Sequence, residues 1–175
     1  MTRRRLWRWS MALLLVPVIA AAAVIAFAYS GVYDIAATRQ HTLPVYWLTD
    51  TVMRYSVARR AAAMPWPPRA QAVSLSRGLR VYREPCLQCH GAPGVAPEPF
   101  ALGLMPVPAN LVETARRWPA RNIHWVIAYG VKMTGMPAWK YRLNDGEIRD
   151  VVAFVEHMAQ LAPNDYAALE RRADA

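Results

Sequence analysis

The feature that most constrains this chain is its use of cysteine. The sequence holds only two cysteines, and both lie in the run Cys86-Leu87-Gln88-Cys89-His90, which has the form C-x-x-C-H. Haem is attached at such a run through two thioether bonds, with the histidine as an axial ligand of the iron. The motif therefore predicts one covalently bound haem c, held by Cys86, Cys89 and His90.

Two other chemistries use a C-x-x-C pair, namely a redox-active dithiol and half of a zinc site. A four-cysteine zinc cluster is excluded because the chain has no second cysteine pair. A thioredoxin-like dithiol is expected near a βαβ unit, and the residues before Cys86 do not have the pattern of a strand. Haem attachment is the interpretation that we carry forward.

Charge divides the 175 residues unevenly. Residues 1–73 carry nine arginines and two acidic residues, whereas residues 74–175 carry twelve basic and ten acidic residues. The basic excess thus precedes the haem motif, and neither a lysine-rich tract nor a repeat accompanies it. This pattern is not typical of a protein that binds nucleic acid, so DNA and RNA are not expected partners. We interpret the excess as a signal for membrane orientation and surface contact.

The first 33 residues predict a membrane anchor. Four arginines lie within residues 3–8, and an uncharged stretch follows from Trp9 to Tyr33. Its most apolar part, residues 11–28, would span about 27 Å as a helix, close to the hydrocarbon thickness of a bilayer. The alternative is a cleaved signal peptide with Ala26-Phe27-Ala28 as its cleavage site. We favour a retained anchor because the apolar run is longer than that of a typical signal.

The arginines also predict the topology. They place the N-terminus in the cytoplasm and the residues after Tyr33 on the outer side. We therefore expect a single-pass protein of a bacterial cytoplasmic membrane, with its haem on the periplasmic side. A loose likeness of residues 2–6 to a twin-arginine export signal is discounted, because arginines before an anchor are expected in any case.

Residues 34–73 predict a juxtamembrane helix and a proline-rich linker. The helix should run from about Pro44 to Ala63, with Thr42 as a possible N-cap. Four of its apolar residues form a stripe at helical spacing: Val45, Leu48, Val52 and Tyr55. This stripe could dock on the protein's own haem domain, on the membrane surface or on a partner subunit. Prolines at 65, 67 and 68 then end the helix and form a stiff linker, across which few contacts are expected.

Three further helices are expected after this linker. One precedes Cys86 and places Gly78 and Tyr82 on one face; another runs from Pro119 to Tyr129 and stops at Gly130. The last opens with a capping box of Asn144 and Glu147. Its apolar face comprises Ile148, Val151, Val152, Val155 and Met158, with Phe154 beside it. Gly78 would let the first and last of these helices approach closely.

The run Val131-Lys132-Met133-Thr134-Gly135-Met136-Pro137-Ala138-Trp139 completes a recognisable order of motifs. A haem motif, then a Gly-Met-Pro-Ala-aromatic run and a capped C-terminal helix, resembles the class I cytochrome c domain over residues 74–160. The resemblance implies a small all-α fold of three or more helices around one haem. The expected organisation is an anchor at 1–33, a juxtamembrane helix and linker at 34–73, a cytochrome c domain at 74–162, and a polar tail at 163–175.

The resemblance also implies the remaining ligands. Met136 aligns with the family's methionine, so His90 and Met136 are the expected axial ligands; Met133, Met105, His124 and an open position are the alternatives. In the family, a prolyl carbonyl accepts the proton of the axial histidine, and Pro106 and Pro108 are the candidates here. Trp118, Trp125, Trp139 and Tyr141 could contact the porphyrin or belong to the core.

These predictions together describe a membrane-anchored monohaem cytochrome c that carries electrons between redox proteins and is not itself an enzyme. A permanent haem subunit of a larger membrane dehydrogenase or oxidase is the close alternative. A haem-based sensor or catalyst would need an exchangeable sixth ligand, and Met136 in its family context argues against one.

Overall fold

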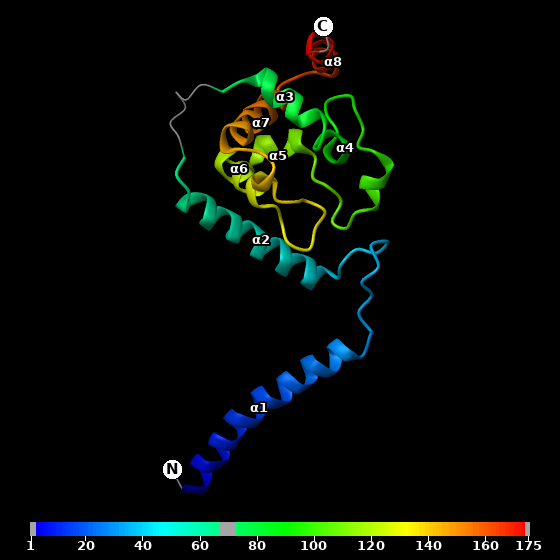
Figure 1. Ribbon diagram of the computed structural model, residues 1–175. Coiled ribbons are helices and arrows are strands. Elements are labelled where there is room, and N and C mark those ends of the chain that lie inside the picture. The colour runs from blue at the N-terminus through cyan, green and yellow to red at the C-terminus, as the bar shows by residue number, and fades with distance from the viewer. Residues whose placement is uncertain (1–2, 67–72, 174–175) are drawn as a thin grey trace. The chain divides into compact units, whose positions relative to one another are not determined.

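The computed structural model describes residues 3–66 and 73–173 (Figure 1). The chain divides into two compact units, Met1–Arg39 and Gln40–Ala175. Pro67 and Pro68, two of the three expected linker prolines, lie outside the described residues.

The first unit consists mainly of one helix, α1 (Arg3–Tyr29). Within it, Met11–Tyr29 has a mean hydropathy of 2.7, and none of the most apolar window is buried inside the protein. Length and hydropathy therefore make α1 suited to a single membrane crossing.

The second unit is built from helices, and the described residues contain no strand apart from one isolated bridge between Ala92 and Val95. The all-α class is confirmed. In chain order its helices are α2 (Leu43–Ala63), α3 (Leu75–Arg83), α4 (Leu87–His90), η1 (Pro99–Gly103), α5 (Leu111–Arg117), α6 (Ala120–Tyr129), η2 (Trp139–Tyr141), α7 (Asp145–Met158) and α8 (Pro163–Ala173).

The crossing of α3 and α7 forms the centre of the core. A Cβ atom added to Gly78 would lie 2.2 Å from the carbonyl oxygen of Asp150 and 2.8 Å from Cβ of Phe154. The rings of Tyr82 and Phe154 meet nearby with centroids 5.4 Å apart. The expected close approach of these helices at Gly78 is thus confirmed.

A buried carboxylate fixes the start of α3 on α7. Asp150 is 1% exposed and accepts hydrogen bonds from the backbone N–H of Ser74, at 2.7 Å, and from the guanidinium of Arg77. The Ser74 hydroxyl in turn caps α3 by accepting from the N–H of Arg77. These bonds satisfy the buried carboxylate and set the direction of the helix that leads into the haem motif.

Local signals set the ends of α6 and α7 as expected. Asn144 and Glu147 form the predicted capping box, with bonds of 3.0 and 2.8 Å. Gly130 ends α6 with φ +66°, and a Cβ there would lie 2.7 Å from the carbonyl oxygen of Met136. The end of α6 is therefore packed directly against the backbone of the predicted methionine loop.

Helix α2 packs against α6, so one of its three expected partners, the protein's own second unit, is observed. The contacting face is not the predicted stripe, however. Val57 and Ala61 are buried, whereas Leu48, Val52 and Tyr55 are exposed. The Arg121 guanidinium also donates to the carbonyl of Ala62 at 3.5 Å.

These contacts correct the expectation that little crosses the proline-rich linker. Trp66 forms an edge contact with His124 at 5.3 Å between centroids, and the Arg54 guanidinium lies 5.7 Å from the ring centre of Trp118. One contact joins the linker itself, and the other joins α2, to residues after the linker.

Besides the short helices α4, η1 and η2, the helices α5 and α8 were not assigned from the sequence. The short α5 is capped by Asn110, whose side chain accepts from the N–H of Glu113 at 3.2 Å. The segment expected as a polar tail forms α8, and its Tyr166 is 0% exposed within the core cluster. Residues 163–173 therefore complete the core.

Packing of α2 predicts different effects for two truncations. A protein that starts at Gln40, exported with a cleavable signal, should keep its full free energy of unfolding. A protein that starts at Val73 should lose about 2–4 kcal/mol, because the surface that buries Val57 and Ala61 becomes exposed to water. Denaturant unfolding followed by circular dichroism measures both; equal stabilities would show that α2 adds nothing to the fold.

Candidate haem-binding site

The C-x-x-C-H motif is folded into one helical turn directly after α3. The carbonyl of Cys86 accepts hydrogen bonds from the N–H groups of Cys89, at 3.1 Å, and His90, at 2.9 Å. Spacing of three in a helical turn places the two cysteine side chains on the same side. Both cysteines are free, Cys86 is buried and Cys89 is half-buried. The pair is thus presented together at the edge of the core.

The electrostatics of Cys86 argue against a redox-active dithiol. Burial, and to a smaller extent the neighbouring Cys89, raises the pKa of the Cys86 thiol to about 12. Dithiol oxidoreductases need a lowered thiol pKa, because the thiolate is the nucleophile. The geometry instead presents a protonated thiol in an apolar environment.

The ring of His90 is held in one tautomer. Its Nδ1 lies 2.7 Å from the carbonyl oxygen of Ala109, and a carbonyl can only accept, so Nδ1 carries the proton. In the neutral ring the lone pair is then on Nε2, the nitrogen available to a metal. The expectation that Pro106 or Pro108 supplies this acceptor is wrong, since the acceptor is the residue after Pro108.

Burial favours the same state of the ring. Loss of water around His90 lowers its pKa, and the hydrogen bond to Ala109 offsets this only in part. A neutral imidazole with a fixed N–H and a free lone pair is what iron ligation requires. His90 therefore fits the axial role that its motif predicts.

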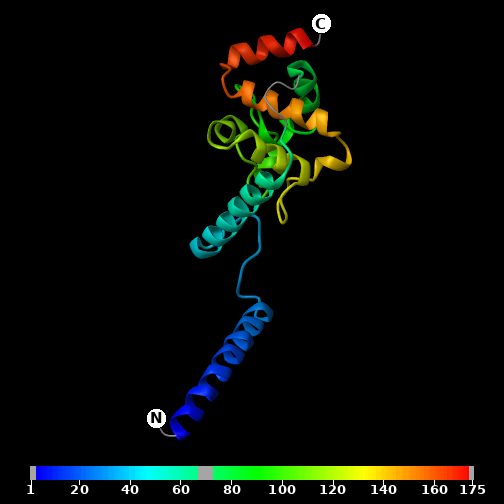
Figure 2. The same ribbon diagram turned by 90° about the vertical axis from the view of Figure 1, so that its left-hand side faces the viewer.

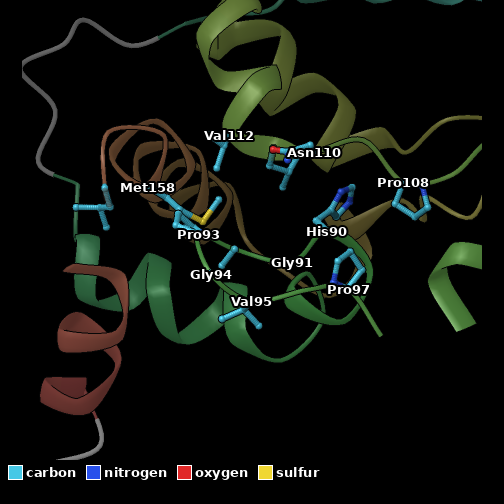
Figure 3. Close-up of a pocket in the computed structure, with 13 residues that line it drawn as sticks. His90, Gly91, Pro93, Gly94, Val95, Pro97, Pro108, Asn110, Val112 and Met158 are labelled. Atoms are coloured by element: carbon cyan, nitrogen blue, oxygen red, sulfur yellow. The ribbon is translucent and has the colours of Figure 1, made fainter. Parts of the chain in front are cut away.

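A cavity of about 350 Å³ lies beside His90 (Figure 3). Its wall comes from the proline-rich loop between His90 and α5, represented by Pro97 and Pro108, and from α7, represented by Met158. The volume is within the range of small-molecule sites, about 300–1,000 Å³. Neither cysteine nor Met136 is among the residues that line it, so the cavity is a hollow on the histidine side of the motif.

Tyr82 joins the motif to the core below it. Its buried hydroxyl donates to the carbonyl of Gly91 at 2.5 Å, one residue after His90. Gly91 has φ +62°, and a Cβ there would lie 2.5 Å from the carbonyl of Val95. The chain can make this tight turn only without a side chain, so the position of His90 depends on both residues.

Met136 lies in a compact loop and is packed against the core cluster that contains Cys86. The loop is closed by its own bonds: the N–H of Met136 donates to the hydroxyl of Thr134 at 3.1 Å, and its carbonyl accepts from Val131 at 3.2 Å. A Cβ on Gly135 would meet the side chain of Leu104 at 2.9 Å. The Met136 loop thus lies against the proline-rich loop that holds the carbonyl partner of His90.

The other candidate ligands have different environments. Met133 is 97% exposed at the tip of the loop, and Met105 is half-buried. His124 is 4% exposed, contacts Trp66 and lies 3.1 Å from a carboxylate oxygen of Asp145. Burial lowers the pKa of His124 to about 4, and these contacts are those of a packing residue.

The four aromatic residues named as possible porphyrin contacts also differ in their environments. Trp118 and Trp139 are half-buried against the core cluster. Trp125 stacks on Tyr129 with centroids 5.2 Å apart, and Tyr141 is 80% exposed beside Lys140. Of the four, Trp118 and Trp139 are therefore the two that belong to the core.

Comparison with known proteins gives one match. Residues 73–155 match the family model described as cytochrome c oxidase, cbb3-type, subunit III. The matched segment begins just before α3 and ends within α7, so it includes both the C-x-x-C-H turn and the Met136 loop. No curated protein and no solved structure matches the chain.

Proposed function

Since residues 73–155 form a c-type cytochrome domain, an electron-transfer module that binds haem c covalently, we propose that the chain is a membrane-anchored, single-haem electron carrier on the periplasmic side of a bacterial membrane. The observation that carries this proposal is His90, whose proton is committed to the Ala109 carbonyl and whose Nε2 is left for the metal. The bound group supplies one-electron transfer between ferrous and ferric iron.

In this proposal Cys86 and Cys89 would hold the haem through thioether bonds, and His90 and Met136 would ligate its iron. A thioether is a soft ligand that favours ferrous iron, which raises the reduction potential relative to two histidines. Support for Met136 comes from its packing against the core cluster that includes Cys86, in contrast to the exposed Met133.

The remaining residues act on the ligands. The Ala109 carbonyl fixes the orientation of the His90 ring and increases its basicity. The turn at Gly91 and the hydroxyl of Tyr82 hold the motif in place. The chain's own contribution is thus to hold the His90 ring in one orientation and one tautomer.

Membrane attachment through α1 is the second part of the proposal. The arginines within residues 3–8 would remain in the cytoplasm, so the second unit would lie on the outer side. Support comes from the hydropathy and length of Met11–Tyr29.

A permanent subunit of a larger oxidoreductase is a second candidate, favoured by one observation. The matched family model describes subunit III of a cbb3-type oxidase. Extraction in mild detergent followed by identification of co-purifying proteins separates the two: a stoichiometric oxidase or dehydrogenase supports the subunit, whereas a lone holoprotein supports the carrier.

Covalent attachment predicts the state of the cysteines. If thioether bonds consume Cys86 and Cys89, the exported protein should contain no alkylatable thiol, and its haem should remain with the chain through denaturation and acid-acetone extraction. Mass spectrometry of the denatured, alkylated protein measures both. Release of haem, or alkylation at either cysteine, would contradict the proposed attachment.

A further inference from the structure

An apolar stripe on α2 is left uncovered by the second unit. Val57 and Ala61, 2% and 0% exposed, face α6, whereas Leu48, Val52 and Tyr55 are 54%, 59% and 73% exposed. At about 100° per residue, Leu48 and Val57 lie on opposite sides of the helix. Leu48, Val52 and Tyr55 therefore face away from the docked side, whereas Val45 at the start of the stripe is half-buried. Helix α2 thus has apolar side chains on two opposite faces.

The charged residues of α2 also differ between its docked side and its uncovered side. Its one acidic residue, Asp50, lies on the docked side and binds Arg54 at 2.7 Å. Arg59 follows Tyr55 by one turn and so extends the exposed stripe, whereas the guanidinium of Arg60 binds the hydroxyl of Ser56 at 2.6 Å. The uncovered side thus carries apolar side chains and the cationic Arg59, with no carboxylate. Such a face fits the surface of an anionic bilayer, whose acyl chains are apolar and whose head groups are negatively charged.

Aromatic residues gather at the end of α2 nearest the anchor in sequence. Tyr46 and Trp47 are 53% and 66% exposed, and the N-terminal half of α2 extends beyond the other helices of the unit (Figure 2). Tyrosine and tryptophan favour the interface between lipid and water, where the ring is in an apolar environment and its polar atom remains hydrated.

The tether limits how far α2 can be from a bilayer. Only residues 30–42 separate the end of α1 from the start of α2, and a fully extended chain of that length spans about 45 Å. If α1 crosses a membrane, as proposed above, α2 is kept close to the surface from which α1 emerges.

We propose that the stripe of α2 lies in the interface of an anionic bilayer, so that α2 is bound to the second unit on one side and to lipid on the other. The inference rests on the proposed anchor but goes beyond it, because it assigns a second, peripheral lipid contact. This contact would restrict the orientation of the haem-binding unit relative to the membrane.

The test uses the full-length holoprotein in nanodiscs of phosphatidylethanolamine and phosphatidylglycerol. A fluorophore is attached to Leu48→Cys on the stripe, or to Glu156→Cys at an exposed position of α7. Each variant is compared in discs with ordinary and with brominated acyl chains, since bromine quenches only dyes that contact lipid. We expect marked quenching at position 48 and none at 156, and reduced quenching at 48 when Arg59→Glu is added.

Absence of quenching at position 48 in protein that remains in the disc would overturn the lipid contact. If position 48 is then found shielded only in native membranes, the stripe binds a partner protein. Failure of the proposed function has separate signatures: labelling of the unmodified chain would show free Cys86 or Cys89, and loss of protein from the discs would show that α1 is not an anchor.

Discussion

Replacement of Met136 by alanine should lower the reduction potential of the holoprotein by on the order of tenths of a volt, because the axial ligand sets the potential of haem iron over a wide range. The resemblance to class I cytochromes also implies a spectroscopic signature of thioether ligation, a weak absorption band at the red edge of the visible spectrum. This band should disappear in Met136→Ala. The iron should also become able to bind carbon monoxide, because loss of the thioether opens its sixth coordination position.

Met133→Ala is the matched control for this experiment. Met133 lies three residues away in the same loop but is 97% exposed, so its removal should leave the band, the potential and the resistance to carbon monoxide unchanged. Met105→Ala should behave in the same way. An unchanged spectrum and potential in Met136→Ala would refute the assignment, and ready binding of carbon monoxide by the unmodified protein would favour a sensor or catalyst.

Features set by local sequence were the ones that the sequence predicted well. The capping box of Asn144 and Glu147 needs only four consecutive residues, and the stop at Gly130 needs one residue that tolerates positive φ. The helix α5 could have been found by the same means, because Asn110 precedes Glu113 by three residues. We assigned no helix there because Pro106 and Pro108 lie shortly before it.

Features set by tertiary contacts were not predictable to the same degree. The acceptor for His90 is a backbone carbonyl, and Ala109 carries no side-chain signal that marks it. The helix α2 was predicted with nearly its observed bounds, but periodicity identified the stripe that remains exposed. The docked face contains the small Ala61 and the single valine Val57, whose burial depends on the shape of α6 and not on their own spacing.

Gly78→Ala should destabilise the holoprotein by about 3 kcal/mol or more, a large share of the 5–15 kcal/mol typical of a folded domain. The added Cβ would be placed 2.2 Å from the backbone oxygen of Asp150, and a backbone atom cannot move aside without separating α3 from α7. The sign of the effect is itself informative, because glycine to alanine inside a helix otherwise stabilises by about 1 kcal/mol. Denaturant unfolding of the holoprotein measures the change.

Gly103→Ala provides the control, since a Cβ at that position meets no atom within 4 Å. It should alter the free energy of unfolding by less than about 0.5 kcal/mol. A stabilised Gly78→Ala protein would show that the helices do not cross closely.

If the crossing is as tight as the structure indicates, the effect of Gly78→Ala should extend to the haem-binding site. Helix α3 leads directly into Cys86, and Tyr82 on the same helix binds the carbonyl of Gly91. Separation of α3 from α7 should therefore also reduce the yield of protein with attached haem, whereas Gly103→Ala should leave that yield unchanged.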